Sequence, residues 1–184
     1  MGVRGIRVAC PGRDSEDCEV AAAKQGNAAA LAAIYEQHRA SVYDLAFSLT
    51  GSPDDAEDVR QMTFLRAFRA LGRFRGESSL RTWLLRICLN VARSARRRQP
   101  CSSCPDEGRQ VDPSDEAHRR LRAEEVRRRV GMLPRWAAEL VALFDLQGFS
   151  YREAAGVLGC SAKGIGPRLH RARKLLRREL EDLV

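Results

Sequence analysis

The chain has 184 residues, of which 44% are hydrophobic, 30% charged and only 6% aromatic, and it carries a formal net charge of +8 with a pI near 9.7. This composition favours small helical modules over an aromatic-rich β sandwich, the basic charge favours an anionic partner such as nucleic acid, and no apolar run approaches the roughly 18 residues of a membrane span. The N-terminal segment is too short and too often interrupted by charge to be a signal peptide, so we expect a cytoplasmic protein without membrane insertion, whose six cysteines stay reduced.

Helical periodicity begins after a short N-terminal tail. Residues 1–14 have no apolar period and are expected to be disordered. Apolar residues then recur at three- and four-residue steps over 31–49, which places them on one face of a helix that ends at Gly51. Ser52 and Pro53 follow as the N-cap and the first residue of the next helix.

An acidic cluster occupies the start of that next helix, and an aromatic, arginine-rich segment follows it. The clustered acids are Asp54, Asp55, Glu57 and Asp58. Each acid near a helix N-terminus contributes about 0.3–1 kcal/mol through the helix dipole, which explains the first two better than the last two. The remaining charge suits a basic protein partner. A loop over residues 72–79 leads to another amphipathic helix, whose buried stripe includes Trp83.

The amino-acid composition changes over residues 99–114, and this segment separates two parts of the chain. Proline, serine and aspartate cluster there without an apolar period, which predicts a flexible linker. A highly charged helix is expected over about 115–132, and another should begin at Leu133 and Pro134. The sequence therefore predicts an all-α fold with two small helical domains joined by this linker.

The C-terminal part has the spacing of a helix-turn-helix. Ser150 and Glu153 form a capping box for a short helix that ends at Gly159, and Ser161 is expected to cap a basic second helix. In this motif the second helix enters the major groove of DNA. A plain helical hairpin with a solvated basic face is the alternative, and we favour DNA binding because basic residues are so dense on the second helix.

Two long stretches resemble a known family. Residues 34–98, which contain Asp-Ala-Glu-Asp and Phe-Arg-Gly-Glu-Ser, resemble the N-terminal domain of extracytoplasmic-function sigma factors. Residues 133–176, which contain Leu-His-Arg-Ala-Arg, resemble the promoter-binding C-terminal domain of that family. The resemblance implies a region 2 domain over 15–98 that binds core polymerase and recognises and melts the minus-ten element. It also implies a region 4 domain over 115–184 that binds the minus-thirty-five element.

The resemblance also implies partners and site residues. The expected partners are the clamp and flap regions of core RNA polymerase, promoter DNA and an anti-sigma factor. The expected polymerase-binding residues are Asp55, Glu57, Asp58 and Gln61. The expected minus-ten residues are Phe74, Arg75, Gly76, Glu77, Ser78 and Asn90, with Phe74 as an exposed aromatic and with Arg81, Arg86 and Arg93 following the DNA backbone. The expected minus-thirty-five residues are Ser161, Lys163, Arg168, His170, Arg171 and Lys174.

Two departures from the family pattern bear on function. Met62 replaces an acid that the family usually has on the polymerase-facing helix. In the recognition helix, Gly166 lacks the usual basic side chain, and Pro167 lies beyond the first turn if that helix starts at Ser161. A proline inside a helix costs about 3 kcal/mol unless the helix begins later or bends. We therefore expect weak or altered recognition of the minus-thirty-five element.

The sequence contains no arrangement of catalytic groups, no phosphate-binding glycine loop and no metal motif, so we expect neither an enzyme nor a cofactor. Cys101 and Cys104 have metal-ligand spacing, but no further ligands have a spacing that supports a zinc site. Two rival functions remain: a stand-alone helix-turn-helix regulator, which predicts dimers on palindromic DNA, and a decoy that binds polymerase or an anti-sigma factor without initiating transcription.

Overall fold

The computed structural model describes residues 13–98 and 115–181. The expected linker, 99–114, lies outside these residues, as does most of the expected tail, whose last two residues begin the first helix. The described residues form helices and turns, with no strand among them, which confirms the all-α prediction. None of the described helices is long and apolar enough to cross a membrane.

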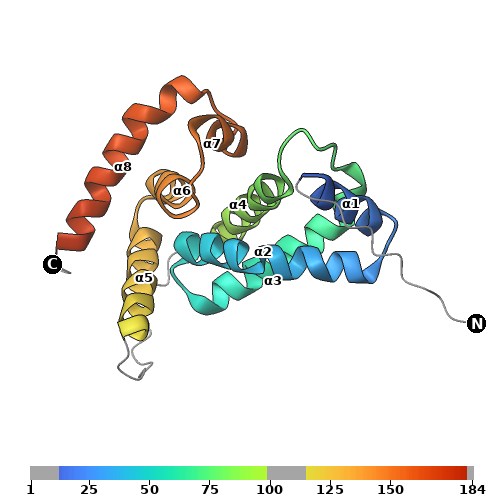
Figure 1. Ribbon diagram of the computed structural model, residues 1–184. Helices are drawn as coiled ribbons and strands as arrows, with labels where there is room; N and C mark the ends of the chain where they lie inside the picture. The colour runs from blue at the N-terminus through green and yellow to red at the C-terminus, as the bar shows by residue number, and fades with distance from the viewer. Residues whose placement is uncertain (1–12, 99–114, 182–184) are drawn as a thin grey trace, which may run out of the picture.

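Five helical elements form the N-terminal domain. They are α1 (Arg13–Lys24), α2 (Ala28–Thr50), α3 (Pro53–Ala70), the 3₁₀ turn η1 (Leu71–Arg73) and α4 (Leu80–Arg98). Helix α2 packs against α1, α3 and α4, and it lies at the centre of the domain (Figure 1). Its buried stripe, which includes Ile34, Val42 and Leu45, meets Leu84 and Leu89 of α4 in the core. Each such side chain contributes about 1.5–3 kcal/mol on burial.

Six elements form the C-terminal domain. They are α5 (Asp115–Met132), α6 (Arg135–Val141), the π-helical turn η2 (Ala142–Leu146), α7 (Tyr151–Leu158), the 3₁₀ turn η3 (Ala162–Gly164) and α8 (Ile165–Leu180). Helix α8 packs on α6 through Ile165, Leu169 and Ala172, which recur at four- and three-residue steps. It runs along the outer side of the molecule, at the opposite end from α1 (Figure 1).

The helix boundaries follow the capping chemistry of the sequence. The Ser52 hydroxyl accepts from the Asp55 N–H at 3.4 Å, and Gly51 ends α2 in the left-handed conformation at φ 74°. The capping box of Ser150 and Glu153 is present at the start of α7. One break was missed: the Asn27 side chain caps α2 by accepting from the Ala29 N–H at 2.9 Å, so α1 and α2 are separate helices.

The two domains are in contact. Helix α5 packs beside α2, and α7 packs beside α4 (Figure 1). The backbones of Gly51 and Gly131 approach so closely that a Cβ on Gly131 would lie 2.7 Å from the Gly51 Cα. Val130, Leu140 and Leu143 of the C-terminal domain belong to the same buried cluster as the core of the N-terminal domain. The sequence predicted two domains but not this close docking.

Candidate functional site

Helix α3 presents a mixed acidic and apolar surface, which we call the α3 face. Its members are exposed and recur at three- and four-residue steps, so they share one side of the helix. They are Asp54, Asp58, Gln61, Met62 and Leu65. Met62 is 40% and Leu65 45% exposed, so two large apolar side chains lie beside the acids on this face. From the sequence, Met62 was interpreted only as the replacement of an acid. Leu65, which follows the buried Phe64 in the chain, was not predicted to belong to this surface.

The other two predicted acids of α3 are less exposed, and the Glu57 carboxylate is paired within the helix. Glu57 Oε1 accepts from Arg60 Nη2 at 2.6 Å and from Gln61 Nε2 at 3.1 Å. Asp55 is half-buried in the first turn of α3, where its backbone N–H donates to the hydroxyl of the N-cap residue Ser52. The exposed negative charge of this surface therefore comes mainly from Asp54 and Asp58.

A loop from Arg75 to Ser79 connects η1 to α4 and is the second candidate surface. Most of its residues are exposed, and Ser78 is half-buried. Gly76 lies at φ 72°, a left-handed conformation that favours glycine. Asn90, also expected to contact the minus-ten element, is exposed on α4. Polar side chains and backbone groups of this loop are thus open to a ligand.

Phe74 corrects one expectation. The sequence predicted an exposed aromatic here, but the side chain is only 8% exposed, and its ring centroid lies 5.1 Å from that of Trp83. Trp83 is half-buried against the core, as expected. Phe74 therefore packs at the base of the loop and presents no ring to a base in this structure.

Helix α1 holds both ends of this loop, which the sequence did not indicate. Lys24 Nζ donates to the Phe74 carbonyl oxygen at 2.7 Å, and Glu16 Oε1 accepts from the Leu80 N–H at 3.2 Å. These pairs are 50 and 64 residues apart in the chain, so no local sequence signal could have found them.

Two arginines expected to follow DNA are bound by the C-terminal domain instead. Arg81 Nη2 donates to the backbone and side-chain oxygens of Gln147 at 2.9 and 2.7 Å, and its guanidinium lies 5.2 Å from the centroid of the Phe149 ring. Arg93 forms two hydrogen bonds with Glu139. Arg86, the third arginine expected to follow DNA from α4, remains exposed. In this docked arrangement Arg81 and Arg93 are unavailable to a nucleic acid.

The recognition helix presents the third surface. All six residues expected at the minus-thirty-five element are exposed on or just before α8: Ser161, Lys163, Arg168, His170, Arg171 and Lys174. Arg173 is different, because its Nη2 pairs with Asp145 Oδ1 at 2.5 Å. The six exposed residues can therefore contact a phosphate backbone, whereas the ion pair of Arg173 with Asp145 connects α8 to η2.

Pro167 is better placed than the sequence suggested. Ser161 precedes the short η3 turn, and α8 begins only at Ile165. Pro167 is therefore the third residue of the helix, where an N–H would have no intrahelical partner. The expected cost of about 3 kcal/mol for an interior proline does not apply.

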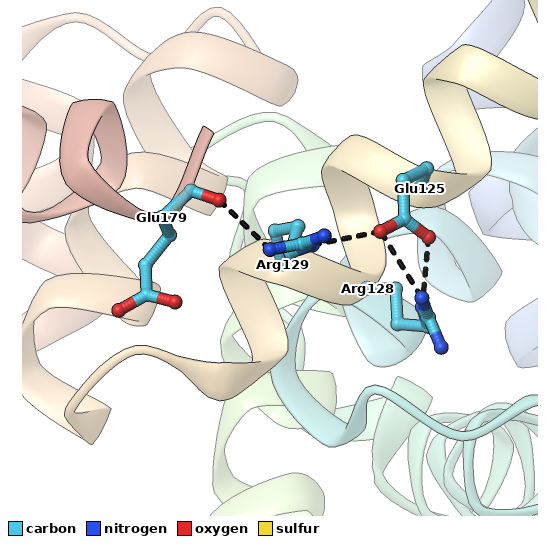
Figure 2. A network of polar contacts seen from close by, with 4 residues as sticks. All are labelled: Glu125, Arg128, Arg129 and Glu179. Atoms are coloured by element: carbon cyan, nitrogen blue, oxygen red, sulfur yellow. Dashed lines mark hydrogen bonds and ion pairs between the residues drawn. The ribbon is translucent and has the colours of Figure 1, made fainter. Parts of the chain in front are cut away.

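Helix α5 closes the C-terminal domain against the end of α8. Figure 2 shows Arg129 between Glu125 and Glu179, donating to Glu125 Oε1 at 2.7 Å and to the Glu179 carbonyl at 3.0 Å. Arg128 donates to the same carboxylate at 2.8 and 3.1 Å, and these hydrogen bonds lower the pKa of Glu125. Arg129 thereby caps a carbonyl in the last turn of α8, where a cation is also favoured by the helix dipole.

Comparisons with known proteins match both domains. The model of Sigma-70 region 2 matches residues 34–100, and that of Sigma-70 region 4 matches residues 123–176. The chain is 32% identical over 145 residues to the ECF RNA polymerase sigma-E factor of Escherichia coli, covering 71% of this chain and 76% of that one. It is 28% identical over 176 residues to the RNA polymerase sigma-H factor of Pseudomonas aeruginosa, covering 88% and 91%.

Two solved structures are similar over most of their length. One is a chain from the complex of CnrH with the cytosolic domain of CnrY, at 30% identity and a TM-score of 0.70, covering 92% of this chain and 99% of that one. The other is from the complex of the sigma factor RpoE with the anti-sigma factor NepR of Bartonella quintana, at 26% identity and a TM-score of 0.65, covering 80% and 94%.

Proposed function

The chain belongs to the extracytoplasmic-function sigma factors, and from its exposed surfaces we propose which residues perform each step of that family's work. As an alternative sigma factor it binds core RNA polymerase and directs transcription initiation at specific promoters. The family consists of initiation factors and is not known for catalysis, so bond formation belongs to the polymerase. The exposed loop and the α3 face, carried together by one small domain, are the observation that supports the assignment of roles most strongly.

The α3 face binds the polymerase clamp. The polymerase contact in this proposal uses Asp58, Gln61, Met62 and Leu65 of this face, together with the neighbouring Asp55 and Glu57 that the family resemblance indicates. The unpaired carboxylate of Asp58 steers a basic partner and raises the association rate. Met62 and Leu65 supply apolar area that is buried on docking, which offsets the acid that the family usually has at position 62.

The loop reads the minus-ten element, and α8 binds the minus-thirty-five element through the six exposed residues described above. In the loop, Arg75, Glu77 and Ser78 supply the polar groups that meet an unstacked base, and Gly76 supplies its left-handed backbone. Asn90 supports them from α4, and Phe74 acts only by packing. Extruding a base costs a few kcal/mol, which contacts made only to the open strand must offset.

Three further proposals concern the cellular setting of the chain. The chain acts in the cytoplasm, in response to an environmental stress, and an anti-sigma partner holds it inactive until then. The similar structure of RpoE is a complex with an anti-sigma factor, which supports this control. Docking of Arg81 and Arg93 on the C-terminal domain supports it too, because such a partner would only need to stabilise an arrangement that the chain already adopts.

Association with core polymerase tests the role of the α3 face. We expect Asp58→Asn to lower the association rate severalfold at low salt, and the difference to vanish near 1 M salt, where the Debye length is about 3 Å. Asp17→Asn, which neutralises an exposed carboxylate of α1, is the matched control. Equal association rates for the two variants at low salt would show that the α3 face does not contact the polymerase.

A further inference from the structure

The loop from Arg75 to Ser79 has weak contacts of its own. Arg75 and Glu77 approach to 4.0 Å, but their side chains are 83% and 81% exposed, and an ion pair in that setting contributes little. The Ser78 hydroxyl reaches the Ser79 carbonyl only at 3.4 Å. Ser79 is the exception and lies at the end of the loop: its hydroxyl oxygen accepts from the Thr82 N–H at 3.2 Å and lies 2.9 Å from the Thr82 hydroxyl. The conformation of the loop must therefore be set largely by what holds its two ends.

Both ends are held by α1. Lys24, in the last turn of α1, donates to the Phe74 carbonyl at 2.7 Å, at the point where the loop begins. Glu16, in the first half of α1, accepts from the N–H of Leu80, where the loop ends and α4 starts. Between them, Val20 is buried in the core, so α1 is itself fixed to the domain.

Each contact has a clear physical role. The Leu80 N–H belongs to the first turn of α4, which lacks intrahelical acceptors, and a carboxylate there is also favoured by the helix dipole. The Lys24 ammonium lies 5.8 Å from the centroid of the Phe74 ring as well as bonding to its carbonyl. Lys24 therefore fixes both the backbone and the ring of the residue that precedes the exposed loop.

We propose that Lys24 and Glu16 are positioning residues for promoter recognition, which hold the two ends of the loop in the geometry that selects an unstacked base. The inference rests on the proposed function of the loop. A loop that is ordered before its ligand arrives loses less conformational freedom on binding and discriminates better between bases. Helix α1 lies outside the residues matched by the region 2 model, 34–100, so that match assigns no role to it.

The experiment uses the full chain and core polymerase on a fragment that the wild-type holoenzyme transcribes, with the six or so positions of its minus-ten element randomised. Sequencing the transcripts gives the base preference at every position. The variants are Lys24→Met, Glu16→Met, which removes the acceptor of the Leu80 N–H, the conservative Lys24→Arg and the control Asp17→Asn; a fifth, Glu77→Ala, alters the loop itself. Polymerase affinity and thermal unfolding of each variant are measured in parallel.

Lys24→Met and Glu16→Met should each reduce the preference about two- to tenfold, the range expected for one partly exposed hydrogen bond. The reduced base preference should be confined to the position of the minus-ten element that Glu77→Ala also affects. Lys24→Arg and Asp17→Asn should keep a base preference close to that of the wild type. The polymerase affinity of all these variants should be unchanged. A preference that falls with Glu77→Ala but not with the α1 variants overturns this inference alone. An equal fall at all positions, together with weaker polymerase binding, would mean a merely structural role and also overturns it. If Glu77→Ala has no effect either, the proposed function of the loop fails and takes the inference with it.

Discussion

Arg93 of α4 and Glu139 of α6 form a two-point ion pair across the boundary between the domains, with Nε–Oε1 at 2.8 Å and Nη2–Oε2 at 2.7 Å. The Glu139 side chain is only 8% exposed, and Arg135 donates to the same carboxylate at 2.9 Å. Burial disfavours the charge, but the hydrogen bonds from Arg93 and Arg135 outweigh it, so the pKa of Glu139 lies below its ordinary value. An ionised carboxylate therefore joins the domains at neutral pH.

Glu139→Ala should lower the free energy of unfolding by about 1–3 kcal/mol, because it leaves Arg93 without its partner in a largely desolvated place. Urea unfolding followed by circular dichroism measures the change. Arg39→Ala is the control, since its pair with Glu36 joins side chains that are 51% and 65% exposed. That variant should change stability by less than about 1 kcal/mol. Equal losses in the two variants would contradict a specific role for the pair between the domains.

Gly131→Ala and Gly156→Ala should change stability in opposite directions, although both place alanine in a helix. A Cβ on Gly131 would lie 2.7 Å from the Gly51 Cα and 2.8 Å from its nitrogen, so two backbones must separate, at a cost of about 1–3 kcal/mol. A Cβ on Gly156 meets nothing within 4 Å. There the better helix propensity of alanine should stabilise α7 by about 0.5–1 kcal/mol. Thermal melts that shift in the same direction for both variants would disprove the close approach of α2 and α5.

The stability of the protein should fall on mild acidification because of His38. Burial lowers the pKa of this side chain from 6.5; the Glu16 carboxylate opposes the shift and the Arg81 cation adds to it. The folded state disfavours the imidazolium, so below about pH 6.5 the unfolded chain binds more protons than the folded one. The contribution of neutral His38 is therefore complete above that pH and is lost as the pH falls through the folded pKa.

Urea midpoints between about pH 5 and pH 8 measure this dependence, in the range where histidine titrates. His38→Met should flatten the profile over the acidic half of the range. The control is His170→Gln, since His170 is exposed, and it should leave the profile as in the wild type. A wild-type profile that His38→Met does not change would assign the acid sensitivity to other groups.

Gly166→Arg should strengthen binding to an isolated minus-thirty-five duplex. A Cβ at this position meets nothing within 4 Å, so the new side chain has room to reach DNA. One added phosphate contact should steepen the dependence of log affinity on log salt by about 0.9. Fluorescence anisotropy across a salt series measures the slope, and Gly72→Arg, an equally open position in the other domain, controls for net charge alone.

Combining Gly166→Arg with Gly164→Thr and Pro167→Ser should add little, because Pro167 already lies in the first turn of α8. A gain that requires Pro167→Ser would show that the proline does distort the recognition helix. The absence of any gain in the triple variant would refute the expectation that the upstream contact is weak for lack of these side chains.

The sequence predicted what depends on local chemistry. Periodicity located the buried stripe of α2, and the caps at Ser52 and Ser150 located the starts of α3 and α7. Prediction from the sequence failed where residues distant in the chain determine whether a side chain is buried. Phe74 is buried because Trp83 and Lys24 pack around it, and Lys24 is 50 residues away in the chain. An aromatic residue in a polar loop gives no sign of such partners.

The docking of the domains was missed for the same reason. Arg93 on a basic helix suggests contact with DNA, and only the fold brings it to Glu139, 46 residues later. Pro167 shows a different limit, since its cost depends on where the helix begins, and a shift of four residues from Ser161 to Ile165 removes that cost.

Multi-round transcription by purified core polymerase, with and without this protein, on a genomic fragment that spans the promoter of its own gene tests the central claim most directly. We expect a transcript that appears only when the protein is added and that is weakened, but not abolished, by Glu77→Ala, since this exposed loop residue should contribute to recognition of the minus-ten element. The absence of a transcript, together with failure of the protein to co-purify with core polymerase, would contradict its function as a sigma factor.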